Sequence, residues 1–264
     1  MTTSVFRALI SMALLLGPVA TGKAVAADIV PPPALPAAPQ PALAPVSPAY
    51  NWSGFHIGGS AGWASRVYDW RYTNPNPATI TPFPVSSNSG IFGGFAGAQY
   101  QFGQVVFGVE YNYNDHFGRQ NLDNVTCGGN LIILTCRLST NALHTVGGKL
   151  GWAFNDLLLY ASGGYAWTRV STRVSNTGNG VVFDTSNAVT QGGAYAGAGL
   201  DYAVWKGGVA DLIAGVEYQH IWIRSVFHGS SADNFAANGV NGRAIKANED
   251  LVRFKLSLKF NPFR

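Results

Sequence analysis

The sequence predicts an all-β protein, folded as an eight-stranded antiparallel barrel. The clearest evidence lies near the C-terminus, where from Val252 to Phe260 every second residue is apolar and every residue between is polar or charged. This period of two indicates a strand with one apolar face. Seven earlier segments alternate in the same way, and the connections between segments are alternately long and short. No proline occurs between Val85 and Asn261, as a continuous hydrogen-bonded sheet requires.

Two N-terminal segments precede the barrel. Arg7, an apolar run over residues 8–16 and the sequence Ala24–Ala26 are typical of an export signal, which predicts a signal peptide at residues 1–26. Residues 27–50 contain eight of the 14 prolines. Because such a segment favours extended polyproline II, we expect residues 27–50 to be a periplasmic linker and residues 51–264 to form the barrel.

The predicted strands follow in chain order, each with apolar side chains on one face and glycine or polar residues on the other. They cover residues 51–64, 91–102, 105–114, 144–154, 157–168, 194–204, 212–222 and 252–260. Short turns are expected at 103–104, 155–156 and 205–208. Long polar loops are expected at 66–88, 115–139, 169–190 and 225–250.

The alternation leaves open whether the apolar face is buried in a soluble fold or faces lipid. Short turns at one end and long loops at the other are characteristic of outer-membrane barrels, with short periplasmic turns and long extracellular loops. Aromatic residues also fall near both strand ends, among them Trp63 and Trp167 at the loop end and Tyr100 and Trp152 at the turn end. These features predict a transmembrane barrel in the outer membrane of a Gram-negative bacterium.

Composition excludes some partners. The chain is 47% hydrophobic and only 11% charged, and its net charge of +4 includes Arg7 and Lys23 of the predicted signal. No basic footprint for nucleic acid remains. Outer-membrane lipid and lipopolysaccharide, which the mixed charges of the long loops could contact, are the expected partners, together with a possible host or surface ligand.

Charged residues on the polar faces are expected to share the barrel interior. They are Glu110, Lys149, Asp201, Glu217, Arg253, Lys255 and Lys259. Because eight strands leave a lumen just wide enough for side chains, we expect a plug of ion pairs; a narrow ion path is the alternative. Glu110 and Glu217 have neither a nucleophile nor a substrate cleft beside them, so we expect no catalytic residues and no enzyme.

Four stretches of the sequence resemble a known family: the opening Trp52–Gly59, the Gly-Val-Glu-Tyr sequences at 108–111 and 215–218, and the closing strand. They are similar to the Omp25/Omp31-type outer-membrane immunogenic and porin-like proteins of alphaproteobacteria. The resemblance implies a structural, envelope-integrity and surface-interaction role, with a narrow porin or a haem or ligand receptor as alternatives. Such barrels commonly end on an aromatic residue read by the barrel assembly machinery, whereas here residues 261–264 follow Phe260.

The remaining candidate residues lie in the predicted loops. Cys127 and Cys136 are the only cysteines, and in an exported protein such a pair predicts a disulfide closing a small hairpin. A zinc site would need more ligands nearby, so no metal or cofactor is expected. His116 and His228 could bind haem from outside, although loop histidines are more often simply solvated.

Overall fold

The computed structural model describes residues 50–73, 83–117, 121–126, 134–176, 178–229 and 242–260. All of them belong to one compact unit, Pro48–Arg264. The predicted signal peptide, and the predicted linker apart from Tyr50, lie outside the described residues. No helix in this part of the chain is long and apolar enough to cross a bilayer.

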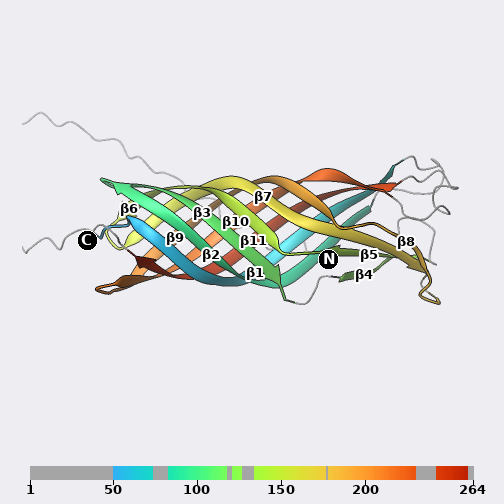
Figure 1. The fold of residues 1–264 in the computed structure, drawn as a ribbon, viewed down its shortest axis with the longest axis horizontal. Helices are drawn as coiled ribbons and strands as arrows, with labels where there is room; N and C mark the ends of the chain where they lie inside the picture. The colour runs from blue at the N-terminus through green and yellow to red at the C-terminus, as the bar shows by residue number, and fades with distance from the viewer. Residues whose placement is uncertain are drawn as a thin grey trace, which may run out of the picture. The chain divides into compact units, whose positions relative to one another are not determined.

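Eight strands close into a hydrogen-bonded ring of antiparallel neighbours (Figure 1). The ring order is β1–β2–β3–β6–β7–β9–β10–β11 and back to β1. This confirms the predicted eight-stranded barrel. The bounds are β1 Gly54–Thr73, β2 Phe83–Phe102, β3 Val105–His116, β6 Leu143–Phe154, β7 Leu157–Asn176, β9 Val189–Lys206, β10 Ala210–Gly229 and β11 Gly242–Phe260.

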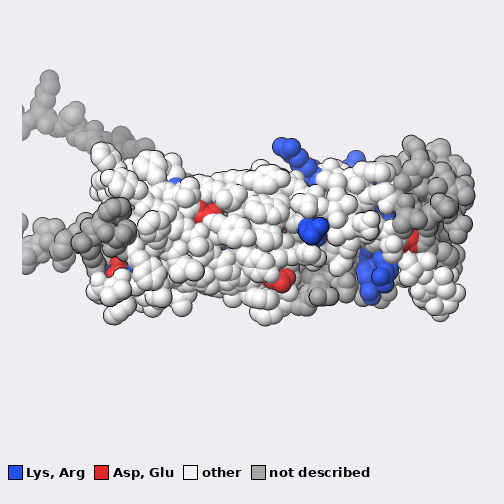
Figure 2. Space-filling view, in the orientation of Figure 1, with Lys and Arg blue, Asp and Glu red and all other residues white. Residues whose placement is uncertain are grey.

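The barrel wall places its apolar side chains outside and its polar side chains inside. In β11, Phe254 is 66% exposed whereas its neighbour Arg253 is 0% exposed. A water-soluble fold would bury the phenylalanine, so this arrangement fits a wall that faces lipid. Figure 2 agrees, because the visible surface nearer the short turns carries few charged side chains, and lysine and arginine gather toward the loop end.

The strands extend further toward the loop end than predicted, so the predicted loop boundaries are wrong. Strand β1 has 20 residues, or about 66 Å at 3.3 Å per residue, far more than a tilted strand needs to cross about 30 Å of hydrocarbon. Beyond the bilayer the outward face meets water, so the apolar alternation fades although the strand continues. Arg71, for example, is exposed on the outer face while Trp70 is buried inside.

Three short strands add to the barrel at its loop end. They are β4 Asn121–Thr126, β5 Leu134–Thr140 and β8 Val182–Thr185. Strand β5 pairs with β7 and β4, and β8 pairs with β7. Pro84 was predicted to lie in a loop but belongs to β2, opposite Asp69 of β1. Strand β3 pairs only with residues 91–102 of β2. At Pro84 that edge of β2 is therefore not paired with β3, and a backbone N–H is not required there.

Close approach of neighbouring strands makes Gly193 of β9 indispensable. A Cβ atom at this position would overlap the carbonyl oxygen of Trp222 in β10. We expect Gly193→Ala to lower the free energy of unfolding by about 1–3 kcal/mol, as overpacking does, in urea titrations of the refolded barrel followed by tryptophan fluorescence. Gly208→Ala is the matched control, because a Cβ there meets nothing within 4 Å. Equal stability of the two variants would contradict this account.

Candidate functional site: a charged plug in the barrel

Six buried ionisable side chains from five strands meet inside the barrel. They are Glu110 from β3, Lys149 from β6, Asp201 from β9, Glu217 from β10, and Arg253 and Lys255 from β11. We call this set the lumen network; it contains three carboxylates and three cations. Each member is at an inward-facing position of its strand, and none is more than 7% exposed.

Small residues on neighbouring strands make room for these long side chains. Glu110 lies in register between Gly97 of β2 and Gly147 of β6. A Cβ at Gly97 would approach His56 Nε2 to 2.7 Å. Because an eight-stranded barrel has space for few interior side chains, the inward glycines allow the charged residues to reach the centre.

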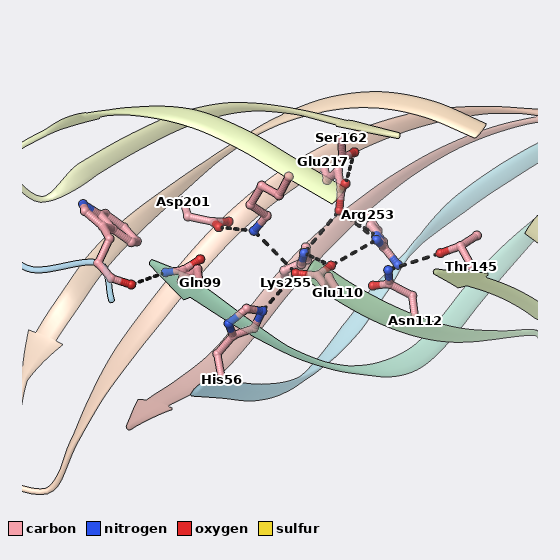
Figure 3. A network of polar contacts seen from close by, with 12 residues as sticks. His56, Gln99, Glu110, Asn112, Thr145, Ser162, Asp201, Glu217, Arg253 and Lys255 are labelled. Atoms are coloured by element: carbon pink, nitrogen blue, oxygen red, sulfur yellow. Dashed lines mark hydrogen bonds and ion pairs between the residues drawn. The ribbon is translucent and has the colours of Figure 1, made fainter. Parts of the chain in front are cut away.

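Glu110 lies at the centre of one half of the lumen network (Figure 3). Its carboxylate lies 2.5 Å from Lys255 Nζ and 3.4 Å from Lys149 Nζ. His56 Nε2 contributes a further contact at 3.1 Å. Lys149 also reaches Asp201, with 3.1 Å between Nζ and Oδ2. Every charge in this half therefore has an opposite charge within contact distance, as burial requires.

Glu217 organises the other half. Arg253 donates to Glu217 Oε2 from both Nε and Nη2, at 3.3 and 2.7 Å, and Lys255 Nζ donates to the same oxygen at 3.2 Å. The second oxygen accepts from Ser162 at 2.9 Å and from Gln219 at 3.0 Å. Lys255 thus joins the two glutamates, and the pair Glu217–Arg253 lies directly in register across β10 and β11.

Almost no free space remains within the lumen network. The cavity lined by Glu110, Lys149, Asp201 and Lys255 measures about 10 Å³, which corresponds to about one water molecule. The ion pairs therefore fill the lumen at this level.

Lys259 was predicted to join this network, but it lies near the turn end in a second closure. Its Nζ donates to the backbone carbonyl of Asn51 and lies 3.3 Å from Asp211. Asp211 also accepts from the hydroxyl of Tyr50 at 2.8 Å. Trp52 is 0% exposed, and its indole donates to the carbonyl of Asn155 in a short turn. We call residues 50–53 the lead-in cap.

A third polar layer lies at the loop end, where charged residues that were predicted to be displayed in loops are buried. Arg66 pairs with Glu249 at 2.9 Å, and Arg243 pairs with Asp184 at 2.8 Å. The prediction was wrong here because it ended the strands too early. In β11 the odd-numbered side chains face inward, from Arg253 back to Glu249 and Arg243. Extending the predicted alternation toward the loop end would therefore have identified two of these four residues.

The two candidate haem ligands also lie in strands rather than loops. His116 of β3 is 7% exposed, and its Nδ1 lies 3.1 Å from Ser89 Oγ. His228 of β10 is fully buried, with its Nε2 2.7 Å from Gln191 Nε2. Neither presents a ring nitrogen to the outside. Within the described ranges no cluster of three metal-ligating side chains is found.

The predicted disulfide is only half inside the described residues. Cys136 lies in β5 and is 2% exposed, whereas Cys127 lies outside them. The disulfide therefore stays a prediction.

A closed antiparallel ring with an apolar exterior and a charged, filled interior defines an outer-membrane β-barrel protein. The family model of the outer membrane protein beta-barrel domain matches residues 33–249, so the chain belongs to that family. No curated protein sequence matches the chain.

Several solved structures of outer-membrane proteins are similar to this chain at low identity. OprG from Pseudomonas aeruginosa is 14% identical, with 81% of this chain and 98% of OprG covered and a TM-score of 0.45. Neisserial surface protein A is 16% identical, with coverage of 79% and 98% and a TM-score of 0.36. The outer membrane protease OmpT from Escherichia coli is 9% identical, with coverage of 78% and 97% and a TM-score of 0.48. At this distance none of them assigns an activity.

Removing Arg253 tests the lumen network. In Arg253→Met, Glu217 loses its bidentate partner inside the barrel, so we expect a loss of about 3–5 kcal/mol in the free energy of unfolding, measured by urea titration in lipid vesicles. The exposed arginine of β10 provides the control Arg224→Met, which should change stability by less than about 0.5 kcal/mol. The double variant Arg253→Met, Glu217→Gln should regain part of the loss. Similar stability of both single variants would contradict the network.

A pH dependence of stability follows from His228, which lies on the loop side of Trp222, an exposed aromatic residue of β10. Burial, reinforced by the nearby Arg243 guanidinium, lowers the pKa of His228 to about 4, compared with about 6.5 in an unfolded chain. Above pH 6.5 the imidazole is neutral in both states. Between pH 6.5 and 4 only the unfolded state takes up the proton, so stability falls as the pH falls. Hydrogen exchange at the loop end of β10 should show this change in the wild type and lose it in His228→Gln.

Proposed function

We propose that the protein is a structural and surface-interaction protein of the outer membrane, whose barrel anchors the segments at its loop end. The observation that carries this proposal is the closed lumen network, with its remaining cavity of about 10 Å³. The lead-in cap and the ion pairs Arg66–Glu249 and Arg243–Asp184 add closures on either side. A barrel filled in this way suits an anchor better than a conduit.

The proposal includes finer assignments that the resemblance and the exported context support. The Trp52–Gly59 opening supports membership of the Omp25/Omp31-type group. An exported chain supports cleavage after residue 26, a periplasmic linker at 27–50 and a disulfide between Cys127 and Cys136. The expected partners remain lipopolysaccharide, the barrel assembly machinery and a host or surface ligand. We assign no catalysis to Glu110 and Glu217, since both carboxylates pair with buried cations and the cavity beside Glu110 measures only about 10 Å³.

A narrow porin is the second candidate, and one observation favours it. Several polar atoms inside the barrel, including His56 Nδ1, Asn112 Oδ1 and Gln219 Oε1, have no hydrogen-bond partner among the described residues. Buried polar atoms of this kind are commonly satisfied by ordered water. If the lumen network rearranged, a continuous row of such waters would form a path for small solutes.

Conductance in a planar bilayer separates the two candidates. We expect the refolded wild type to be silent, because the ion pairs close the lumen. Glu110→Ala tests the plug directly, and Asp69→Ala, which changes a half-buried carboxylate at the loop end, is its matched control. Discrete openings of the wild type whose size changes only in Glu110→Ala would establish a porin and overturn the anchor proposal.

Envelope permeability tests the structural role. Deleting the gene in its host should increase uptake of a hydrophobic dye across the outer membrane, and a plasmid copy of the wild type should restore the barrier. Reduced uptake of small hydrophilic solutes with an intact dye barrier would instead support the porin.

A further inference from the structure

A cavity of about 670 Å³ lies on the outer wall of the barrel, outside the closed lumen. It occurs where the wall between β3 and β6 is interrupted. Their last paired residues are Asn114 and Leu143, and pairing resumes between β4 and β5 at Asn121 and Ser139. The cavity-lining residues Asp115, Thr140, Asn141 and Ala142 fall between these two pairings.

The floor of the cavity is a row of aromatic rings. Tyr113 of β3, His144 of β6 and Trp167 of β7 lie in register across three neighbouring strands. The rings of His144 and Trp167 are stacked, with centroids 5.2 Å apart and planes 6° apart. Tyr113 meets His144 edge-on at 5.4 Å. The row therefore lines the cavity with aromatic ring edges, because Trp167 is stacked between His144 and Tyr165.

Polar groups form a second row one step nearer the loop end. Asp115 follows Tyr113 in β3, Arg169 follows Trp167 in β7, and Thr190 of β9 lies opposite Arg169. Asn141 completes the row from the break between β5 and β6, where its side chain is exposed. No acidic side chain of the described residues lies within ion-pair distance of Arg169, so its guanidinium is available to an anion.

The two rows lie at the outer rim of the lipid-facing wall. On the turn side of the aromatic row, the exposed outward side chains are apolar, including Tyr165, Val146 and Leu150. On its loop side they are Asp115, Asn141 and Arg169. Aromatic rings gather at membrane interfaces because the boundary between apolar and polar surroundings suits them. A lipid bound in the cavity would therefore keep its acyl chains in the bilayer and its headgroup in water.

We propose that this cavity binds the phosphorylated saccharide headgroup of a glycolipid in the outer leaflet. The ring edges of the aromatic row suit the apolar patches of a sugar, and the Arg169 guanidinium suits a phosphate, to which it can donate two hydrogen bonds. Asp115 and Asn141 supply acceptors and donors for hydroxyl groups. This inference rests on the lipopolysaccharide partner of the proposed function, to which it gives a binding site, and the site does not depend on whether the barrel conducts.

Native mass spectrometry of the refolded protein tests the proposal, with a bisphosphorylated, acylated glucosamine disaccharide as the probe. Arg169→Gln should weaken binding roughly tenfold, as the loss of one charge-assisted contact does. Arg224→Gln is the matched control, because Arg224 follows Trp222 in β10 with the same spacing but does not line the cavity. Trp167→Leu should also weaken binding, and a heat-shift gel confirms that each variant is folded.

Further probes identify the chemistry that is recognised. The dephosphorylated glycolipid should bind the wild type about as weakly as the phosphorylated probe binds Arg169→Gln. Free glucosamine phosphate should bind far more weakly than the whole glycolipid, since it has no acyl chains to contact the apolar wall. Equal effects of the Arg169 and Arg224 substitutions, or binding of the free sugar phosphate as tight as that of the glycolipid, would overturn the proposal.

Discussion

Closure of the hydrogen-bonded ring between β1 and β11 is the constraint on which the rest of the structure depends. Inside hydrocarbon an unpaired backbone group costs several kcal/mol, so only a sheet without free edges can cross it. Pairing from Phe55–Phe260 to Thr73–Gly242 meets this requirement over the whole length of β1. Once the ring is closed, each strand must give one face to lipid and the other to a narrow interior, and the positions of Phe254 and Arg253 follow.

The narrow interior then explains why the charged residues form a compensated network. A buried ion is costly unless it is paired and hydrogen-bonded, and a pair replaced by apolar groups of similar shape can be equally stable. The lumen network therefore contributes to the specificity of the strand register as much as to the free energy of folding. Glu217 accepts hydrogen bonds from Arg253, Lys255, Ser162 and Gln219 at once, so a shift in strand register would leave several of these groups unpaired.

Sequence patterns predict the wall of this barrel well and its two ends poorly. The alternation in residues 252–260 correctly separates lipid-facing from interior side chains because hydrocarbon demands an apolar outer face. Outside the bilayer that demand ends, and the pattern no longer distinguishes the strand at Arg66–Thr73 from a loop. The pairing of Arg243 with Asp184 depends on tertiary packing, as does the burial of His116 and His228. Trp52 was predicted to lie at the start of a strand, and only the folded barrel shows that it fills the turn end.

The lead-in cap joins the segment before β1 to the last two strands of the barrel. Lys259, next to the last residue of β11, holds the backbone of Asn51 from 208 residues earlier in the sequence, and Asp211 of β10 holds Tyr50. These contacts cannot form in a partly built wall, because their partners belong to the final two strands. Trp52 and Ser53, by contrast, bond to Gln99 and Gln101 of β2 and to Asn155 of a short turn. The segment can therefore dock on earlier strands first, and its full set of contacts forms only when β11 lies beside β1.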